Sequence, residues 1–200
     1  MESQTAFVRD VADNRSSYRS QVNQFSEPSS MPYTWTSTDT KYAALASIVP
    51  VGLGIASSLG TLEGGRYRRH FERSTKPGWA NFDSALFSHT DLLTLSPLGY
   101  ASYLIFKNGG GFDYTDTTTA LGLYGTSMIL VASTIPLLDK GSHKGLAINS
   151  ALLAATATAT FVAFRKIDER ASWFALPFAV WSVLQAVLNF QLYQLNSRDI

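Results

Sequence analysis

The sequence predicts an all-α, polytopic membrane protein in which a bundle of five helices crosses the bilayer. Three observations support this fold class: five long apolar segments, short charged connections between them, and few charged residues. Only 16% of the 200 residues are Asp, Glu, Lys or Arg, against roughly 25% in ordinary soluble domains. The mean hydropathy of +0.03 conceals this pattern, because the first forty residues are polar and the apolar residues are segregated beyond them.

Five segments reach the length of roughly 20 apolar residues that a helix needs to cross a bilayer. We expect the spans at residues 42–62, 85–106, 118–138, 145–164 and 173–195. The second is the least apolar, because it contains His89 and Asp91. Residues 151–164 have no polar stripe beyond threonines, whereas a buried helix of a soluble protein usually carries one.

The polar region at residues 1–40 is expected to be an N-terminal arm, followed by the membrane domain at residues 41–200. Its Ser, Gln and Asn content is typical of disorder, and we expect a binding partner to hold it in place. It contains no apolar core long enough for a secretory signal. Acidic residues also interrupt the arginines that would favour a transit peptide.

Composition and motifs argue against catalysis and against nucleic-acid binding. The net charge of +1 provides no field that would attract nucleic acid. The chain has no cysteine and three histidines, so we expect no metal site. We also find no paired catalytic carboxylates, no Ser-His-Asp arrangement and no phosphate-binding glycine loop. The sequence therefore predicts a protein that is not an enzyme and that requires no cofactor.

Small residues recur at every fourth position in two of the predicted spans. Such faces allow helix backbones to approach closely in lipid. They indicate either a subunit interface or ordinary packing inside the bundle, and the second is the commoner role for any one face. The residues are Gly52, Ala56 and Gly60 in the first span and Ala151, Ala155, Ala159 and Ala163 in the fourth.

Several short motifs resemble those of the TspO/MBR (translocator protein) family in their order and spacing. The first loop ends in Lys-Pro-Gly-Trp at residues 76–79, where the family has Lys-Pro-x-Trp. Leu-Pro-Phe at residues 176–178, Trp181 and Leu-Asn-Phe at residues 188–190 are similar to the family's fifth span. The similarity extends over residues 43–196 and implies a five-helix bundle with a ligand cavity.

The resemblance also implies which residues line that cavity. At several of these positions the sequence differs from the family. The candidates are Trp79, Asp91, Leu95, Trp181 and Asn189. Asp91 and Leu95 stand where the family has tryptophan and tyrosine, and Ser127, Val131 and Thr134 replace the Gln, Asn and Trp of the third span. Flat aromatic ligands are held by stacking and by a few placed polar groups. We therefore expect weaker binding of the porphyrins and sterols that the family binds.

Asp91 has two interpretations that the sequence leaves open. A carboxylate at membrane depth costs several kcal/mol unless it is paired, protonated or hydrated. It is either a polar group of the cavity, in contact with a ligand or a neighbouring subunit, or a solvated residue close to the interface. Gln185 of the fifth span either hydrogen-bonds between helices or lines the cavity, and packing between helices is the preferred role.

Two functions follow from these observations. The preferred hypothesis is a non-catalytic accessory subunit of a larger mitochondrial membrane complex of the respiratory-chain kind, with other membrane subunits and lipids as partners. The alternative is a translocator-type protein that binds a tetrapyrrole, such as a porphyrin or haem, or a sterol, and forms a homodimer. The mitochondrial, inner-membrane location rests on analogy with the family.

Overall fold

The computed structural model describes residues 35–60, 65–80 and 84–197, and all regular structure among them is helical. In chain order the elements are α2 (Ser37–Gly60), α3 (Arg66–Arg73), α4 (Ser84–Asn108), the 3-10 turn η1 (Gly111–Asp113), α5 (Thr115–Asp139), α6 (His143–Ile167) and α7 (Glu169–Asn196). The predicted all-α class is confirmed. Four of the predicted spans each lie within one long helix, and the first, residues 42–62, follows α2 to its end at Gly60, with residues 61 and 62 outside the described residues.

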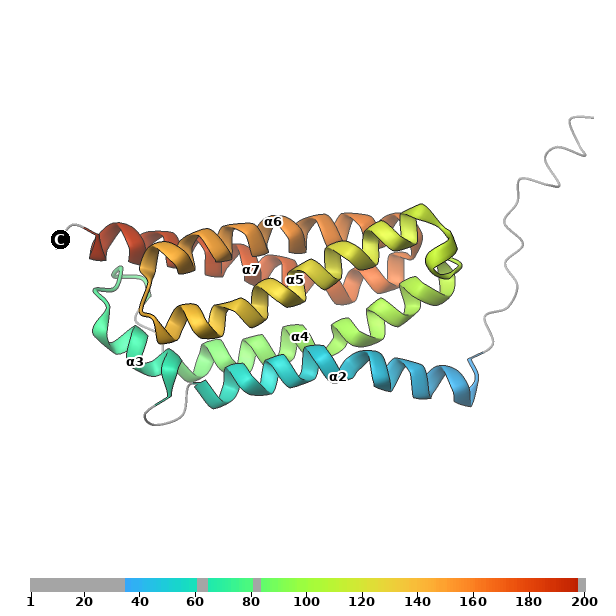
Figure 1. The fold of residues 1–200 in the computed structure, drawn as a ribbon, viewed down its shortest axis with the longest axis horizontal. Coiled ribbons are helices and arrows are strands. Elements are labelled where there is room, and N and C mark those ends of the chain that lie inside the picture. The colour runs from blue at the N-terminus through green and yellow to red at the C-terminus, as the bar shows by residue number, and fades with distance from the viewer. Residues whose placement is uncertain (1–34, 61–64, 81–83, 198–200) are drawn as a thin grey trace, which may run out of the picture. The chain divides into compact units, whose positions relative to one another are not determined.

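The five long helices lie lengthwise against one another in a single bundle (Figure 1). The most extensive contacts join α6 to α7 and α2 to α4, followed by α5 with α6 and α4 with α7. The short helix α3 lies at the end of the bundle where α5 turns into α6 and where α7 ends (Figure 1). Its position there places its side chains over one end of the helix interior.

Four of the described helices are long and apolar enough to cross a membrane: α2, α5, α6 and α7. Large apolar side chains on these helices point outward. Contact with lipid would cover them at no cost, whereas contact with water would be unfavourable. On α2 they include Leu45, Ile48, Val49 and Ile55. Helix α4 has the same 25-residue length as α5, but its serines, threonines and Asp91 make it less apolar. A count of five spans therefore stays a prediction.

Most of the predicted N-terminal arm lies outside the described residues, but its last part belongs to the bundle. Helix α2 begins at Ser37, and Asp39 in its first turn is only 6% exposed. The Lys107 ammonium lies 2.6 Å from the Asp39 carboxylate, and the Tyr103 hydroxyl donates to the same group at 2.5 Å. Helix α2 therefore begins before the domain boundary that we expected at residue 41, and these contacts attach its first turn to α4. The expected partner of the arm stays a prediction.

Two glycines other than the predicted ones bring α2 and α4 together. A Cβ on Gly99 would lie 2.2 Å from the Cα of Ser47, and one on Gly54 would lie 3.1 Å from the Cα of Leu92. Gly52, by contrast, has no atom of the described structure within 4 Å of such a Cβ. Close packing of α2 inside the bundle therefore uses the Gly54 side of the helix.

The small-residue face predicted for α6 also lies outside the buried side of its helix. Ala151 and Ala155 are exposed, and Ala159 and Ala163 are partly exposed. The core of this helix is formed instead by Leu153, Ala157, Thr160 and Phe164. The part of the predicted face at Ala151 and Ala155 is therefore on the outside of the bundle, whereas Ala163 packs against the core. Use of this face by a second subunit stays a prediction.

Gly99→Ala should destabilise the bundle by about 1–3 kcal/mol, because the new methyl group collides with backbone and not with a movable side chain. Thermal unfolding in detergent, followed by circular dichroism, should show a clear drop in Tm. Gly52→Ala is the matched control, since it adds the same atom on α2 in open space. An equal loss of Tm in both variants would contradict the proposed close contact at Gly99.

Candidate functional site

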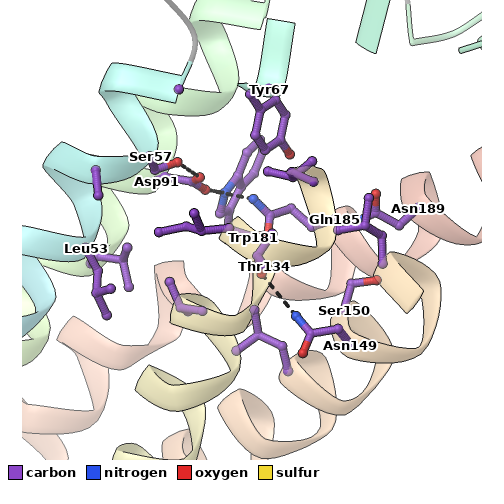
Figure 2. A pocket seen from close by; sticks show the side chains of 18 of the residues that line it. Leu53, Ser57, Tyr67, Asp91, Thr134, Asn149, Ser150, Trp181, Gln185 and Asn189 are labelled. Carbon is purple, nitrogen blue, oxygen red and sulfur yellow. Dashed lines mark hydrogen bonds between the residues drawn. The ribbon is translucent and has the colours of Figure 1, made fainter. Parts of the chain in front are cut away.

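The interior of the bundle contains a cavity of about 70 Å³ between α2, α4, α5, α6 and α7, with Tyr67 of α3 at one end. Most of its wall is apolar, and polar side chains gather at two places (Figure 2). One polar group surrounds Asp91 of α4 and the other surrounds Asn149 of α6. An apolar cavity with a few convergent polar groups is the usual form of a small-molecule site.

Asp91 is the centre of a hydrogen-bond network that joins three helices (Figure 2). Its Oδ2 atom accepts a hydrogen bond of 2.5 Å from the Ser57 hydroxyl of α2. Its Oδ1 atom accepts from the Trp181 indole N–H at 2.5 Å and from the Gln185 side-chain amide at 2.7 Å, both on α7. Asp91 is partly exposed and forms part of the cavity wall. The carboxyl group is therefore both a structural link and a group that a ligand can reach.

The three donors leave one acceptor position of this carboxylate open. An ionised carboxyl group accepts at about four lone-pair positions, and three are occupied by the side chains just described. Among the described residues, the wall of the cavity contains no Lys, Arg or His that could balance the charge. A buried carboxylate without a cation is unfavourable in a membrane. A ligand that brings a hydrogen-bond donor or a positive charge would relieve this imbalance.

The second polar group holds α6 against α5. The side-chain amide of Asn149 donates to the Leu130 carbonyl and to the Thr134 hydroxyl, at 3.0 Å in each case. Its oxygen accepts from the Ser133 hydroxyl at 2.7 Å. Because these contacts satisfy the donors and the acceptor of the amide, Asn149 has mainly a positioning role in this state.

Aromatic residues close the end of the cavity beneath α3. The rings of Tyr67 and Phe87 are stacked at 5.9 Å, and Phe71 and Trp181 contact Phe87 at 5.3 and 5.6 Å. Burial, and to a smaller extent the nearby Asp91 charge, raises the pKa of the Tyr67 phenol. Tyr67 therefore stays neutral at pH 7 and presents a hydroxyl group to the cavity.

Four of the five sequence-predicted cavity residues meet in this wall: Asp91, Leu95, Trp181 and Asn189. Trp79 does not belong to it. Its ring is 47% exposed, and its indole N–H donates to the Gln191 side chain at 2.7 Å. The segment that contains Trp79 is fixed to the end of α7, because Asn196 exchanges two hydrogen bonds with the backbone of Thr75. This attachment holds Trp79 on the outside of the bundle.

The structure also adds cavity residues that the sequence interpretation did not include. Ser57, Tyr67 and Asn149 line the cavity. Gln185 fills both of the roles considered for it, because it lines the cavity and also donates to Asp91 of another helix. The spacing of four between Trp181 and Gln185 places both on one face of α7. That spacing could have identified Gln185 once Trp181 was assigned to the cavity. Ser127, expected near the ligand, is instead fully buried outside the cavity wall.

Metal and haem ligands do not gather at this site. Within the described ranges, no group of three or more His, Asp or Glu side chains is placed to hold a metal ion. His89, two residues before Asp91, is exposed on the outer side of α4. The chemistry available in the cavity is therefore hydrogen bonding, apolar contact and the carboxyl group of Asp91.

The bundle and its apolar helices define an integral membrane protein with an internal cavity. The model of the TspO/MBR family matches residues 46–195, and the chain belongs to this family. The translocator protein of Bos taurus is 28% identical over 160 residues, which cover 73% of this chain and 89% of that protein. The Homo sapiens translocator protein is 29% identical over 152 residues, with the same two coverages.

A shorter match is found with the translocator protein of Ovis aries, which is 34% identical over 102 residues. That match covers 50% of this chain and 60% of the relative. The resemblance inferred from the motifs at residues 76–79 and 176–190 is thus confirmed for the family.

Asp91→Leu should lower the free energy of unfolding by about 3 kcal/mol, because it leaves the donors of Ser57, Trp181 and Gln185 without an acceptor in a buried place. Asp91→Asn keeps one acceptor oxygen and should cost less. Chemical unfolding in detergent gives both values. Asp113→Asn, in the exposed turn η1, is the control. Equal stability of the Asp91→Leu variant and the wild type would contradict the network.

Proposed function

We propose that this protein binds a largely apolar small molecule in the cavity and recognises it by a hydrogen-bond donor directed at Asp91. The open acceptor position on the Asp91 carboxylate, facing an apolar wall, is the observation that supports this function. Sterols fit the requirement, because their hydroxyl group is a donor on a large apolar body. A metal-free porphyrin also provides pyrrole N–H donors, whereas haem has none. Binding and transfer of such a molecule require no catalytic group.

The cavity is too small for such a ligand unless side chains in its wall move. A volume of about 70 Å³ is well below the roughly 300–1,000 Å³ of typical ligand pockets. Trp181 and Gln185 occupy the space next to Asp91, and Tyr67 covers the end of the cavity. A ligand therefore has to displace one or more of these side chains, and its donor then reaches the open acceptor position of Asp91 through the space that they vacate.

Cholesterol and its methyl ether provide a test of the donor, because they differ in the hydroxyl hydrogen and one methyl group. The wild type in detergent should bind cholesterol about tenfold more tightly than the ether, as expected for a difference of about 1.4 kcal/mol from one hydrogen bond to a charged group. In the Asp91→Asn variant the difference should shrink to about twofold. Quenching or shift of tryptophan fluorescence measures binding, and Trp181→Phe identifies the responding ring.

The same titration with a porphyrin and with its N-methylated form tests the tetrapyrrole alternative. Asp113→Asn should leave every affinity unchanged, since this carboxylate lies outside the cavity. Failure of all four compounds to bind, or equal affinity of the Asp91 variant and the wild type, would refute recognition through Asp91.

The second candidate function is a structural subunit of a larger membrane assembly, in mitochondria by analogy with the family. The small cavity favours it, since the side chains around Asp91 fill space that a ligand would need. The exposed alanine face of α6 favours it as well, because small residues permit close contact with another helix. Under this proposal the Asp91 network is purely structural.

Native electrophoresis of mildly solubilised membranes separates the two functions. A structural subunit should migrate only within a large assembly, at a constant ratio to its other subunits as measured by mass spectrometry. Ala155→Phe on the outer face of α6 should release the chain from the assembly, whereas Leu152→Phe, also exposed on this helix, serves as the control. Migration of the wild type as a small free species would exclude the subunit function.

A further inference from the structure

A second pocket, of about 340 Å³, opens at the end of the bundle between α3 and the turn that joins α5 to α6. Arg69, His70 and Arg73 line it from α3, and Lys140 and His143 line it from the turn and the start of α6. This pocket shares only Leu138 with the wall of the Asp91 cavity, and the ligand chemistry described for Asp91 does not use it.

Positive charge dominates this second pocket. The wall of the pocket contains three cations, Arg69, Arg73 and Lys140, and one carboxylate, Asp139. The described part of the chain gives none of these three cations an ion-pair partner, whereas the neighbouring Arg68 is paired with Glu72 at 2.7 Å. Three cations around one concave space attract an anion more strongly than a single surface charge does.

Two histidine rings form the base of the pocket, and each carries a buried nitrogen without a partner. The ring centroids of His70 and His143 are 4.7 Å apart. His70 Nε2 and His143 Nδ1 are inaccessible and make no hydrogen bond in the described structure. Buried polar atoms are nearly always paired, so such a pair requires an explanation. A phosphate group can satisfy either tautomer, since its oxygens accept from a ring N–H and its P–OH group donates to a ring lone pair.

The lowered pKa of His70 is consistent with an anion site that is empty. Burial, and secondarily the positive charge of His143 when protonated, lower the pKa of His70 to about 4. His70 is therefore neutral at pH 7 when the pocket is empty. A bound anion would favour the charged imidazole and would raise this pKa.

The pocket lies at the level where lipid headgroups meet the protein. Helix α5 ends at Asp139 and α6 begins at His143, so the pocket surrounds the ends of two spans. Basic pockets between helices at this level are typical binding sites for phosphorylated headgroups. Arg and Lys side chains at span ends also reach the interface readily.

We propose that this pocket, between α3 and the α5–α6 turn, binds a phosphate monoester, with Arg73 and Lys140 as its charged ligands and the pair of His70 and His143 beneath it. The phosphate group belongs either to an anionic phospholipid such as phosphatidic acid or to a soluble phosphate compound. The proposal is independent of ligand binding at Asp91.

Calorimetric titration of the full chain in neutral detergent tests the proposal, with short-chain phosphatidic acid, short-chain phosphatidylcholine and inorganic phosphate as the three probes. Phosphatidic acid should bind, and the double substitution Arg73→Gln and Lys140→Gln should weaken its binding by at least about tenfold, the loss expected for one charged hydrogen bond. Lys144→Gln, close by in α6 but outside the pocket wall, is the matched control and should change the affinity by about twofold or less.

His70→Phe provides a second variant that keeps the ring contact and removes the nitrogens. It should weaken binding while leaving the Tm of the empty protein close to that of the wild type. Binding of inorganic phosphate in competition with phosphatidic acid would support the site and assign it to a soluble phosphate. Binding of the lipid alone would support the site and assign it to a headgroup. Absence of binding by both phosphate probes, or equal weakening by Lys144→Gln and the double substitution, would overturn the proposal.

Discussion

The interior of this protein depends on one carboxyl group. Asp91 receives donors from α2 and α7 while it belongs to α4, so three helices of the bundle share a single acceptor. In lipid the apolar helices gain nothing from leaving water, and packing and polar links decide how they associate. A side chain that the membrane would otherwise exclude thus sets the position of Trp181, the shape of the cavity and the group that a ligand meets there.

The sequence was sufficient for the five long helices and for four of the cavity residues, but not for the short helix α3. Apolar runs of fixed length locate membrane helices because the bilayer has a fixed thickness, and the motifs at residues 176–190 placed Trp181 and Asn189 on the inner face of α7. The contacts between distant segments could not be read in this way. Gly54 and Gly99 allow α2 to pack on α4 because each lies opposite the backbone of the other helix. The regular spacing of Gly52, Ala56 and Gly60 had indicated another side of α2.

The sequence motifs also could not locate Trp79 in the fold. Its position depends on hydrogen bonds between its segment and residues more than a hundred positions further along the chain. Gln191 and Asn196 hold the segment on the outside of α7, and the similarity of the fifth span to the family does not indicate such a contact. The histidine pair illustrates the same difficulty. His70 and His143 are far apart in the chain, and only the folding of α3 over the α5–α6 turn brings their rings together.

The attachment of Thr75 to Asn196 has a consequence for the order in which the cavity is completed. The first loop carries α3, whose Tyr67 covers the cavity, but the residue that fixes this loop lies in the last turn of the last helix. Packing of Tyr67 and Phe71 against Phe87 also holds α3 in place, whereas the hydrogen bonds to Asn196 can form only after that final turn has emerged and folded. These bonds are therefore the last part of the attachment to form, and the C-terminal turn completes the fixing of a loop that was synthesised much earlier.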